Sequence, residues 1–252
     1  MRLTLIQTDI EWAAPEANLQ RLEQRLTAAP QSDLYVLPEM FATGFCTSPD
    51  GITEEAEQGT VYQWMTRWAR QLNSAIAGSV AVRERDDGSC RNRLYFIKPD
   101  GEVHYDKHHL FTYGGEHEGY LAGDKRVIVE WRGVRFLLQV CYDLRFPIWV
   151  RWSRNSPFDA IIYVASWPDT RMVVWNTLLR ARAIENQCYV LGVNRIGTDP
   201  YCRYTGGSML VDAYGKATEA ASGESSLTAT LDLEKLRAFR KKFPVLADRD
   251  PF

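Results

Sequence analysis

The pattern of apolar and polar positions along the chain predicts an α/β domain in which strands and helices alternate. Amphipathic helices are expected at 15–29, 60–72, 147–153, 173–185 and 233–242. Apolar runs of strand length lie between them, at 2–8, 33–39, 75–83, 91–98, 102–106, 127–131, 134–140, 160–166, 189–194, 208–212 and 226–232. No linker or low-complexity block interrupts the alternation, so we expect one domain over 1–252 with mixed sheets and a C-terminal tail at about 243–252.

The segment 133–147 draws attention because its buried strand stops on a thiol. Cys141 follows the apolar run 134–140, and Pro147 stands where the next helix is expected to begin. Open α/β sheets place their chemistry at the carboxyl ends of strands, which favours a functional thiol. Free cysteine is also among the most buried residue types, so an inert core residue is the alternative interpretation.

Composition and charge narrow the class of protein. Apolar residues make up 45% of the 252 and charged residues 25%, and the formal net charge is −2, which gives no electrostatic reason to expect nucleic acid or an anionic membrane as a partner. No segment approaches the roughly 18 consecutive apolar residues that a membrane span needs. The five cysteines are odd in number and form no CxxC pair, which argues against a disulfide framework and favours a cytoplasmic location.

Two charged residues occupy positions equivalent to that of Cys141. Glu39 and Lys107 each follow the end of a predicted strand, and strand ends from neighbouring strands converge at one edge of a sheet. A carboxylate can accept the proton of a thiol, and an ammonium can stabilise the oxyanion that forms when a thiolate attacks a carbonyl. Taken singly, Glu39 is more often a loop cap, Lys107 a surface lysine and Cys141 a core cysteine than a catalytic residue.

The four histidines raise the possibility of a metal site or a Cys–His dyad. His108 and His109 are adjacent in an extended segment, so their side chains should point to opposite faces. No complete ligand set occurs at a familiar spacing, and we expect no metal and no cofactor. A papain-like hydrolase with a histidine as base stays an alternative.

Three segments resemble the signature motifs of the nitrilase (carbon–nitrogen hydrolase) superfamily, in the family's order. These are Leu37-Pro-Glu-Met-Phe, Tyr105-Asp-Lys-His-His-Leu-Phe and Val140-Cys-Tyr-Asp-Leu-Arg-Phe-Pro, and Arg180-Ala-Arg-Ala-Ile-Glu-Asn-Gln-Cys-Tyr-Val matches a further family segment. The resemblance runs from Met1 to about Phe243 and is greatest to the omega-amidase branch and its bacterial amidohydrolase relatives.

The resemblance implies a four-layer αββα sandwich and assigns roles to individual residues. It makes Glu39 the general base, Lys107 the oxyanion-stabilising cation and Cys141 the nucleophile. The family often carries a second glutamate after the lysine, and counting back from Ala122-Gly-Asp places it at Glu116, with Glu118 as the neighbouring alternative. The family's usual proline is replaced here by Ala122.

Residues around the motifs are candidates to bind the substrate. An omega-amidase-like substrate also carries a carboxylate, for which Arg145, Arg171 and Arg195 are the available cations, and Arg145 is alternatively a structural partner of Asp143 or Glu39. The substrate-binding set that we predict is Phe41, Phe111, Tyr113, Tyr142, Trp167 and Arg145, with core packing as the alternative for each aromatic residue.

The function implied by the resemblance is hydrolysis of a small linear amide, the ω-amide of a dicarboxylic or keto-dicarboxylic acid, through a Cys141 thioester. A nitrilase or N-carbamoyl amidohydrolase with the same trio is the alternative, and a non-catalytic scaffold that binds a small ligand is the alternative from another class. We expect a homodimer or a higher homo-oligomer, paired through the helices at 147–153 and 173–185. These helices carry more large apolar residues than the surface of a monomer usually does, namely Trp149, Trp152, Trp175 and Leu179.

Overall fold

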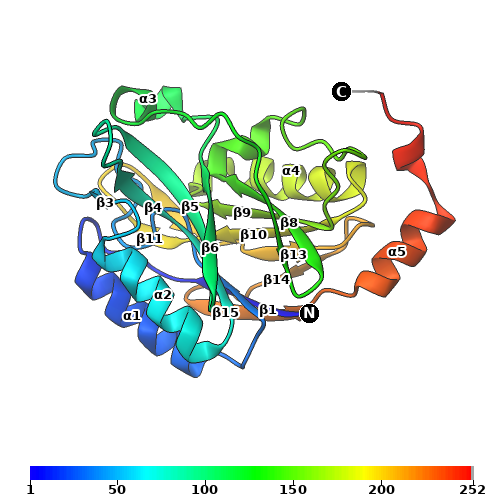
Figure 1. Ribbon diagram of the computed structural model, residues 1–252, viewed down its shortest axis with the longest axis horizontal. Coiled ribbons are helices and arrows are strands. Elements are labelled where there is room, and N and C mark those ends of the chain that lie inside the picture. The colour runs from blue at the N-terminus through cyan, green and yellow to red at the C-terminus, as the bar shows by residue number, and fades with distance from the viewer. Residues whose placement is uncertain (251–252) are drawn as a thin grey trace.

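The computed structural model, which describes residues 1–250, contains two β-sheets that pack face to face (Figure 1). In the first sheet the strand order is β15 (Ser225–Thr230), β1 (Arg2–Gln7), β2 (Leu34–Val36), β4 (Ala75–Arg83), β5 (Cys90–Lys98) and β6 (Gly101–Asp106), with β3 (Glu54–Glu55) paired to β4. In the second the order is β14 (Ala217–Glu219), β13 (Met209–Val211), β10 (Tyr189–Asn194), β9 (Ala160–Ala165), β8 (Val134–Val140) and β7 (Ile128–Trp131). A separate hairpin joins β11 (Ile196–Thr198) to β12 (Arg203–Thr205).

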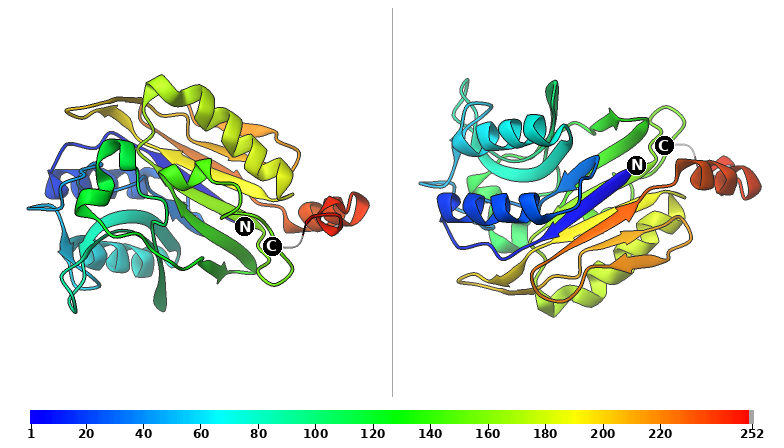
Figure 2. Two further views of the ribbon diagram at one scale, coloured as in Figure 1. Left: turned by 90° about the horizontal axis from the view of Figure 1, so that it is seen from above. Right: turned by 90° about the horizontal axis from the view of Figure 1, so that it is seen from below.

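Helices cover the outer face of each sheet, so the predicted four-layer αββα sandwich is confirmed (Figure 2). The first sheet is covered by α1 (Pro15–Ala28) and α2 (Thr60–Leu72), and the second by α4 (Met172–Glu185). The remaining helical segments are α3 (Glu116–Gly119), α5 (Leu233–Lys242) and the 3₁₀ turns Thr112–Gly114, Cys141–Arg145, Asp169–Arg171 and Val245–Ala247.

The alternation of side chains along the strands builds the central core between the sheets. In β8, Phe136, Leu138 and Val140 point toward the first sheet, whereas Leu137 packs under α4. In β1, Leu3 and Leu5 face the second sheet and Ile6 packs under α1 and α2. Because side chains of a strand alternate between faces, a strand covered on both faces needs an apolar residue at nearly every position.

The topology brings several strand ends to one edge of the sandwich. The strands β1, β2 and β4 are parallel, as are β8, β9 and β10, while β6 lies two antiparallel steps from β4 and therefore runs in the same direction. Glu39, Lys107 and Cys141 follow the carboxyl ends of β2, β6 and β8. Residues that are widely separated in the sequence are thereby placed on a common, rigid edge.

The helix predicted at 147–153 is wrong. The chain forms a 3₁₀ turn already at Cys141–Arg145 and continues through isolated turns that include a hydrogen bond from Arg151 N to Ile148 O. Trp149 stacks on His108 with ring centroids 3.7 Å apart, and the Trp152 amide donates to Asn186. These tertiary contacts hold the backbone in a path that a regular helix would not follow.

The other predicted helices are present. At the start of α2, Thr60 is the first helical residue and Gly59 occupies the cap position. The carboxylate of Glu54 accepts hydrogen bonds from the amides of Val61 and Tyr62, at 2.8 and 2.9 Å, and so satisfies the free N–H groups of the first turn. Of the predicted tail, residues 243–250 are described and 251–252 lie outside the described part.

Within residues 1–250, none of the helices has the length and apolar character needed to cross a membrane.

Candidate active site

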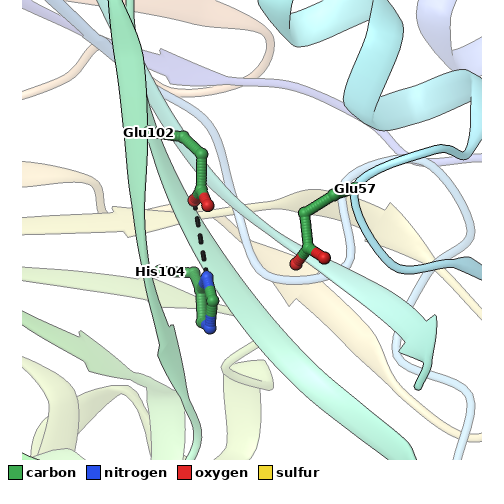
Figure 3. A group of neighbouring side chains, drawn as sticks. All are labelled: Glu57, Glu102 and His104. Atoms are coloured by element: carbon green, nitrogen blue, oxygen red, sulfur yellow. Dashed lines mark ion pairs between the residues drawn. The ribbon is translucent and has the colours of Figure 1, made fainter. Parts of the chain in front are cut away.

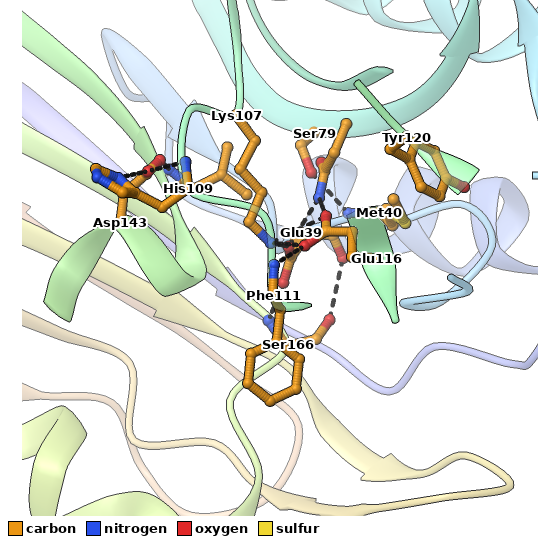
Figure 4. Close-up of polar contacts among 12 residues, drawn as sticks. Glu39, Met40, Ser79, Lys107, His109, Phe111, Glu116, Tyr120, Asp143 and Ser166 are labelled. Atoms are coloured by element: carbon orange, nitrogen blue, oxygen red, sulfur yellow. Dashed lines mark hydrogen bonds and ion pairs between the residues drawn. The ribbon is translucent and has the colours of Figure 1, made fainter. Parts of the chain in front are cut away.

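Glu39 and Lys107 meet at the edge where their strands end (Figure 4), and Cys141 lies beside them. The Lys107 ammonium is 2.9 Å from Glu39 Oε1, and both side chains are fully buried. Cys141 lies next to Glu39, close enough for the carboxylate to raise the pKa of the thiol. The trio of predicted catalytic residues is therefore assembled by strand ends from both sheets.

Glu116, at the start of α3, is brought into the same cluster. Its Oε2 accepts a hydrogen bond of 2.8 Å from Lys107 Nζ and another of 2.6 Å from the amide of Phe111, and its Oε1 lies 3.1 Å from Lys107 Nζ. Glu118 is exposed on the outside of the short helix. The structure thus places Glu116, and not Glu118, against the lysine.

Two polar groups that sequence reasoning missed complete the cluster. Asn92, on β5, donates from Nδ2 to Glu39 Oε1 at 2.9 Å and to Glu116 Oε1 at 3.0 Å. The backbone amide of Ser166, at the end of β9, donates to Glu39 Oε2 at 2.9 Å. Both carboxylates are therefore oriented by donors from surrounding strands.

Burial and charge set the protonation states in this cluster. Burial raises the pKa of the Cys141 thiol, the carboxylate of Glu39 raises it further, and Lys107 opposes both. Burial would lower the pKa of Lys107, but Glu116 and Glu39 outweigh it and hold the pKa above its ordinary value. Burial likewise raises the pKa of Glu116 against the opposing Lys107. At neutral pH the sulfur is thus a thiol beside an ammonium, and a base must accept its proton before it can attack.

The turn that carries the nucleophile is held by one buried carboxylate. Cys141 has a left-handed backbone with φ of 44°, between the end of β8 and the 3₁₀ turn. Asp143 accepts from Val140 N and Tyr105 Oη through Oδ2, and from His109 N and Nδ1 through Oδ1, at 2.8–3.0 Å. These bonds tie the nucleophile's turn to the segment after Lys107 and stabilise its otherwise unfavourable conformation.

A cavity of about 370 Å³ opens in front of Cys141 and Lys107. Five of the six predicted substrate-binding residues line it: Phe111, Tyr113, Tyr142, Trp167 and Arg145. The prediction for Phe41 is wrong, because its ring is fully buried against Trp64 and over Gly78 in the core under α2. Sequence reasoning missed the lining residues contributed by the β11–β12 hairpin, Asp199, Tyr201, Cys202 and Tyr204.

The three arginines considered as carboxylate ligands differ in their surroundings. Arg145 and Arg171 line the cavity, where their guanidinium groups lie over the rings of Trp167 and Phe111, each at 5.2 Å. Within residues 1–250 neither guanidinium has a carboxylate partner, so Arg145 pairs with neither Asp143 nor Glu39. Arg195 is buried elsewhere and donates to Asp9 and to the carbonyl of Ile10.

The histidines are engaged in structural contacts away from the thiol. His109 Nδ1 lies 2.8 Å from Asp143, and His108 Nδ1 contacts the carbonyl of Gly123. Figure 3 shows a different group, in which His104 pairs with Glu102 at 3.4 Å near Glu57. The carboxylate of Glu57 is already bound by Arg93 at 2.8 Å, so this group is a surface ion-pair network.

The model of one protein family, described as carbon–nitrogen hydrolase, matches residues 2–241. The chain belongs to the carbon–nitrogen hydrolase family. It is 45% identical to the omega-amidase YafV of Yersinia enterocolitica over 100% of this chain and 98% of the relative. It is 32% identical to the 2-oxoglutaramate amidase of Bacillus subtilis strain 168, over 98% and 96% of the two chains.

A solved carbon–nitrogen hydrolase has the same fold. XC1258 from Xanthomonas campestris, a CN-hydrolase superfamily protein whose structure carries an arsenic adduct in its active site, superposes with a TM-score of 0.94 and is 40% identical, over 100% of this chain and 98% of that one. The protein is accordingly a carbon–nitrogen hydrolase that acts on non-peptide bonds.

Proposed function

We propose that this hydrolase cleaves the ω-amide of a dicarboxylic or 2-oxo-dicarboxylic acid to the free acid and ammonia, with Glu39, Lys107 and Cys141 as its catalytic triad and Glu116 in support. The observation that carries the proposal is a cavity lined both by the thiol and by two guanidinium groups, which have no carboxylate partner among the described residues. A linear amide with a terminal carboxylate has one group for the thiol and one for a guanidinium. Relatives named omega-amidase and 2-oxoglutaramate amidase support the same class of substrate.

The first half of the reaction forms a thioester. Glu39 Oε2 accepts the proton of Cys141 as the sulfur attacks the amide carbon. The negative charge that develops on the carbonyl oxygen is stabilised by the Lys107 ammonium and the amide N–H of Tyr142. Glu39 then donates its proton to the amide nitrogen, the C–N bond breaks, and ammonia leaves.

The second half regenerates the thiol. A water molecule occupies the place left by ammonia and gives a proton to Glu39 as its oxygen attacks the thioester carbon. The tetrahedral intermediate again places its oxyanion beside Lys107. When the C–S bond breaks, Glu39 returns the proton to Cys141, and the product leaves as a carboxylic acid that ionises in water.

The alternatives fit the geometry less well. A papain-like mechanism needs an imidazole against the thiol, whereas His108 and His109 bond to Gly123 and Asp143 and line no part of the cavity. A non-catalytic scaffold would gain nothing from burying two carboxylates and a lysine beside a thiol, since such burial is costly. Nitrile and ureido substrates would use the same trio, and assay alone distinguishes them from amides.

Ammonia release from matched substrates tests the proposal. The wild type is expected to hydrolyse succinamate or 2-oxoglutaramate with a higher kcat/KM than the uncharged amide butyramide, and than the corresponding nitrile and ureido acids. Arg145→Met or Arg171→Met should raise KM for the acidic amides by about 10- to 100-fold, the effect of losing one charge-assisted hydrogen bond, and leave butyramide unaffected.

A surface arginine supplies the control for that comparison. Arg67 pairs with Glu23 on the outside of α2, and Arg67→Met should change neither KM. If the wild type preferred butyramide, or if both cavity variants left the KM for succinamate unchanged, the acidic-amide proposal would fail.

We propose that the enzyme is a homodimer whose interface contains other residues than those predicted from the sequence. Trp175 and Leu179 are fully buried in the protomer's own core, so they cannot form an interface. Ile148 and Val173, in contrast, are 75% and 81% exposed, on the turn after the nucleophile and at the start of α4. Light scattering should give a dimer for the wild type at micromolar concentration and a monomer for the Ile148→Asp/Val173→Asp double variant. A wild-type monomer would contradict the proposal.

We also propose that the enzyme is cytoplasmic. Each of the five cysteines is free, and Cys90 and Cys188 lie buried without a disulfide partner. Free thiols in this number are typical of a reducing compartment.

A further inference from the structure

The buried cluster contains more carboxylate than its one cation can balance. The side chains of Glu39, Glu116 and Lys107 are all fully buried, so two carboxylates share a single ammonium. The excess negative charge can be balanced only by neutral donors or by proton uptake. Apart from Lys107 itself, Asn92 is the one side chain among the described residues that donates to both carboxylates.

The lone pairs of Glu116 are fully used. A carboxylate offers about four acceptor positions, two on each oxygen. Oε1 of Glu116 accepts from Asn92 at 3.0 Å and from Lys107 at 3.1 Å, and Oε2 accepts from Lys107 at 2.8 Å and from the Phe111 amide at 2.6 Å. A proton could bind Glu116 only by displacing one of these donors.

Glu39 differs from Glu116 at one oxygen. Its Oε1 is filled by Lys107 and Asn92, each at 2.9 Å, but its Oε2 accepts only the Ser166 amide at 2.9 Å. One acceptor position on Oε2 is thus left open on a carboxylate that lies next to the Cys141 thiol. In this cluster it is the single carboxylate lone pair without a protein N–H donor.

We propose that Asn92 is a positioning residue that makes Glu39 Oε2 the only proton acceptor in the cluster. The amide fills one lone pair on each glutamate, so that a proton from Cys141 or from water has a single destination within reach of the substrate. The inference rests on the proposed catalytic role of Glu39 and extends it to a residue that touches neither the thiol nor the cavity.

Two further observations fix the orientation of the Asn92 amide. Its Oδ1 is buried with no hydrogen-bond partner, and turning the amide around would bring this oxygen against two carboxylate oxygens. The backbone carbonyl of Asn92 accepts from Lys107 N at 3.0 Å, which ties the start of β5 to the segment that carries the lysine. The backbone of Asn92 is thus fixed next to Lys107. The two hydrogen bonds that Nδ2 donates offset the cost of burying Oδ1 without a partner.

The consequence of removing the donor follows from the charge balance. In Asn92→Ala, Oε1 of each glutamate loses the hydrogen bond from the Asn92 amide. The negative charge that Lys107 does not balance is then less well stabilised. Burial already raises the pKa of Glu116, so this residue would compete with Glu39 for protons. The acid limb of the pH–kcat profile should therefore move to higher pH by about one to two units, which corresponds to the loss of one hydrogen bond to a charged group. KM should stay close to the wild-type value.

Asn92→Asp is the second variant, because it keeps the shape of the side chain if the alanine variant fails to fold. A third carboxylate in the cluster should move the acid limb further in the same direction. Asn18 supplies the matched control: it is also buried, and its Nδ2 also donates two hydrogen bonds, to the carbonyls of Glu11 and Ala42. Asn18→Ala should be less stable than the wild type, but the acid limb of its pH–kcat profile should not shift.

Two measurements separate this proposal from the proposed function. The pH dependence of kcat is measured with succinamate, and the pH dependence of Cys141 alkylation by iodoacetamide is followed by peptide mass spectrometry, which needs no substrate. If the wild type did not hydrolyse succinamate, the proposed function would fail, while a shifted alkylation profile in the Asn92 variants would still support the role of Asn92. Unshifted alkylation and kcat profiles in both Asn92 variants would overturn it, as would equal shifts in Asn18→Ala.

Discussion

Replacing Cys141 by alanine is expected to lower kcat for amide hydrolysis by about 10⁴-fold or more, because no thioester can form without the sulfur. Alanine and cysteine both carry a Cβ at this left-handed position, so the substitution adds no backbone strain beyond that of the native residue. Lys107 and Glu39 keep their hydrogen bonds, and the cavity gains space. Ammonia release at saturating succinamate measures the loss, and calorimetry should still detect succinamate binding.

Cys46→Ala is the control for that experiment. Cys46 is partly exposed, lies outside the cavity lining and donates a hydrogen bond to the carbonyl of Ser48, so turnover should stay near the wild-type value. Full turnover by Cys141→Ala would contradict the covalent mechanism. Loss of turnover in both variants would point to general damage by cysteine replacement instead.

The α/β class and the positions of the strands could be predicted from the apolar pattern because the strands are covered on both faces, whereas the four-layer sandwich was implied by the family resemblance. Runs such as 134–140 and 160–165 are apolar at nearly every position, and a strand between another sheet and a helix requires that pattern. The ends of these runs then located Glu39, Lys107 and Cys141. Periodicity does not give the order of strands within a sheet, so it could not predict that these three residues meet at one site. The resemblance to the family motifs supplied that prediction.

Asn92 was missed because its strand begins like a solvent-exposed one. The sequence Arg91-Asn-Arg-Leu-Tyr-Phe-Ile alternates charged and polar residues before it becomes apolar, which is typical of an edge strand. In the structure β5 lies between β4 and β6, with Asn92 and Arg93 buried. Arg93 is neutralised by Asp106 and Glu57, and Asn92 by the two catalytic-cluster glutamates. Only partners distant in the sequence reveal that these polar residues are internal.

The wrong predictions for Phe41 and for the helix at 147–153 share a physical cause. Apolar residues near Cys141 and Glu39 were assigned by their proximity in the sequence to a motif, whereas packing decides which way they point. Phe41 follows Glu39 by two residues yet turns into the core under α2. Trp149 and Trp152 were assigned to a helix, but each is fixed by a side chain from elsewhere in the fold, His108 and Asn186. Tertiary contact overrode local preference in both cases.

Glu39→Gln is expected to separate thiol ionisation from turnover. The negative charge of Glu39 is one of the causes that raise the pKa of Cys141, after burial. Removing that charge leaves the Lys107 ammonium beside the sulfur, so the thiol should titrate at a lower pH than in the wild type. Turnover should nevertheless fall by about 10²- to 10⁴-fold, because no group can protonate the leaving ammonia or accept a proton from the attacking water.

Ultraviolet absorbance of the thiolate across a pH titration, with Cys141→Ala as the blank, measures the first effect, and ammonia release measures the second. Opposite directions of change, a more acidic thiol in a less active enzyme, would identify Glu39 as the proton carrier of both half-reactions. A purely structural role would lower activity without making the thiol more acidic. A histidine-based mechanism would leave turnover largely intact in Glu39→Gln, and that result would contradict the assignment of Glu39 as the base.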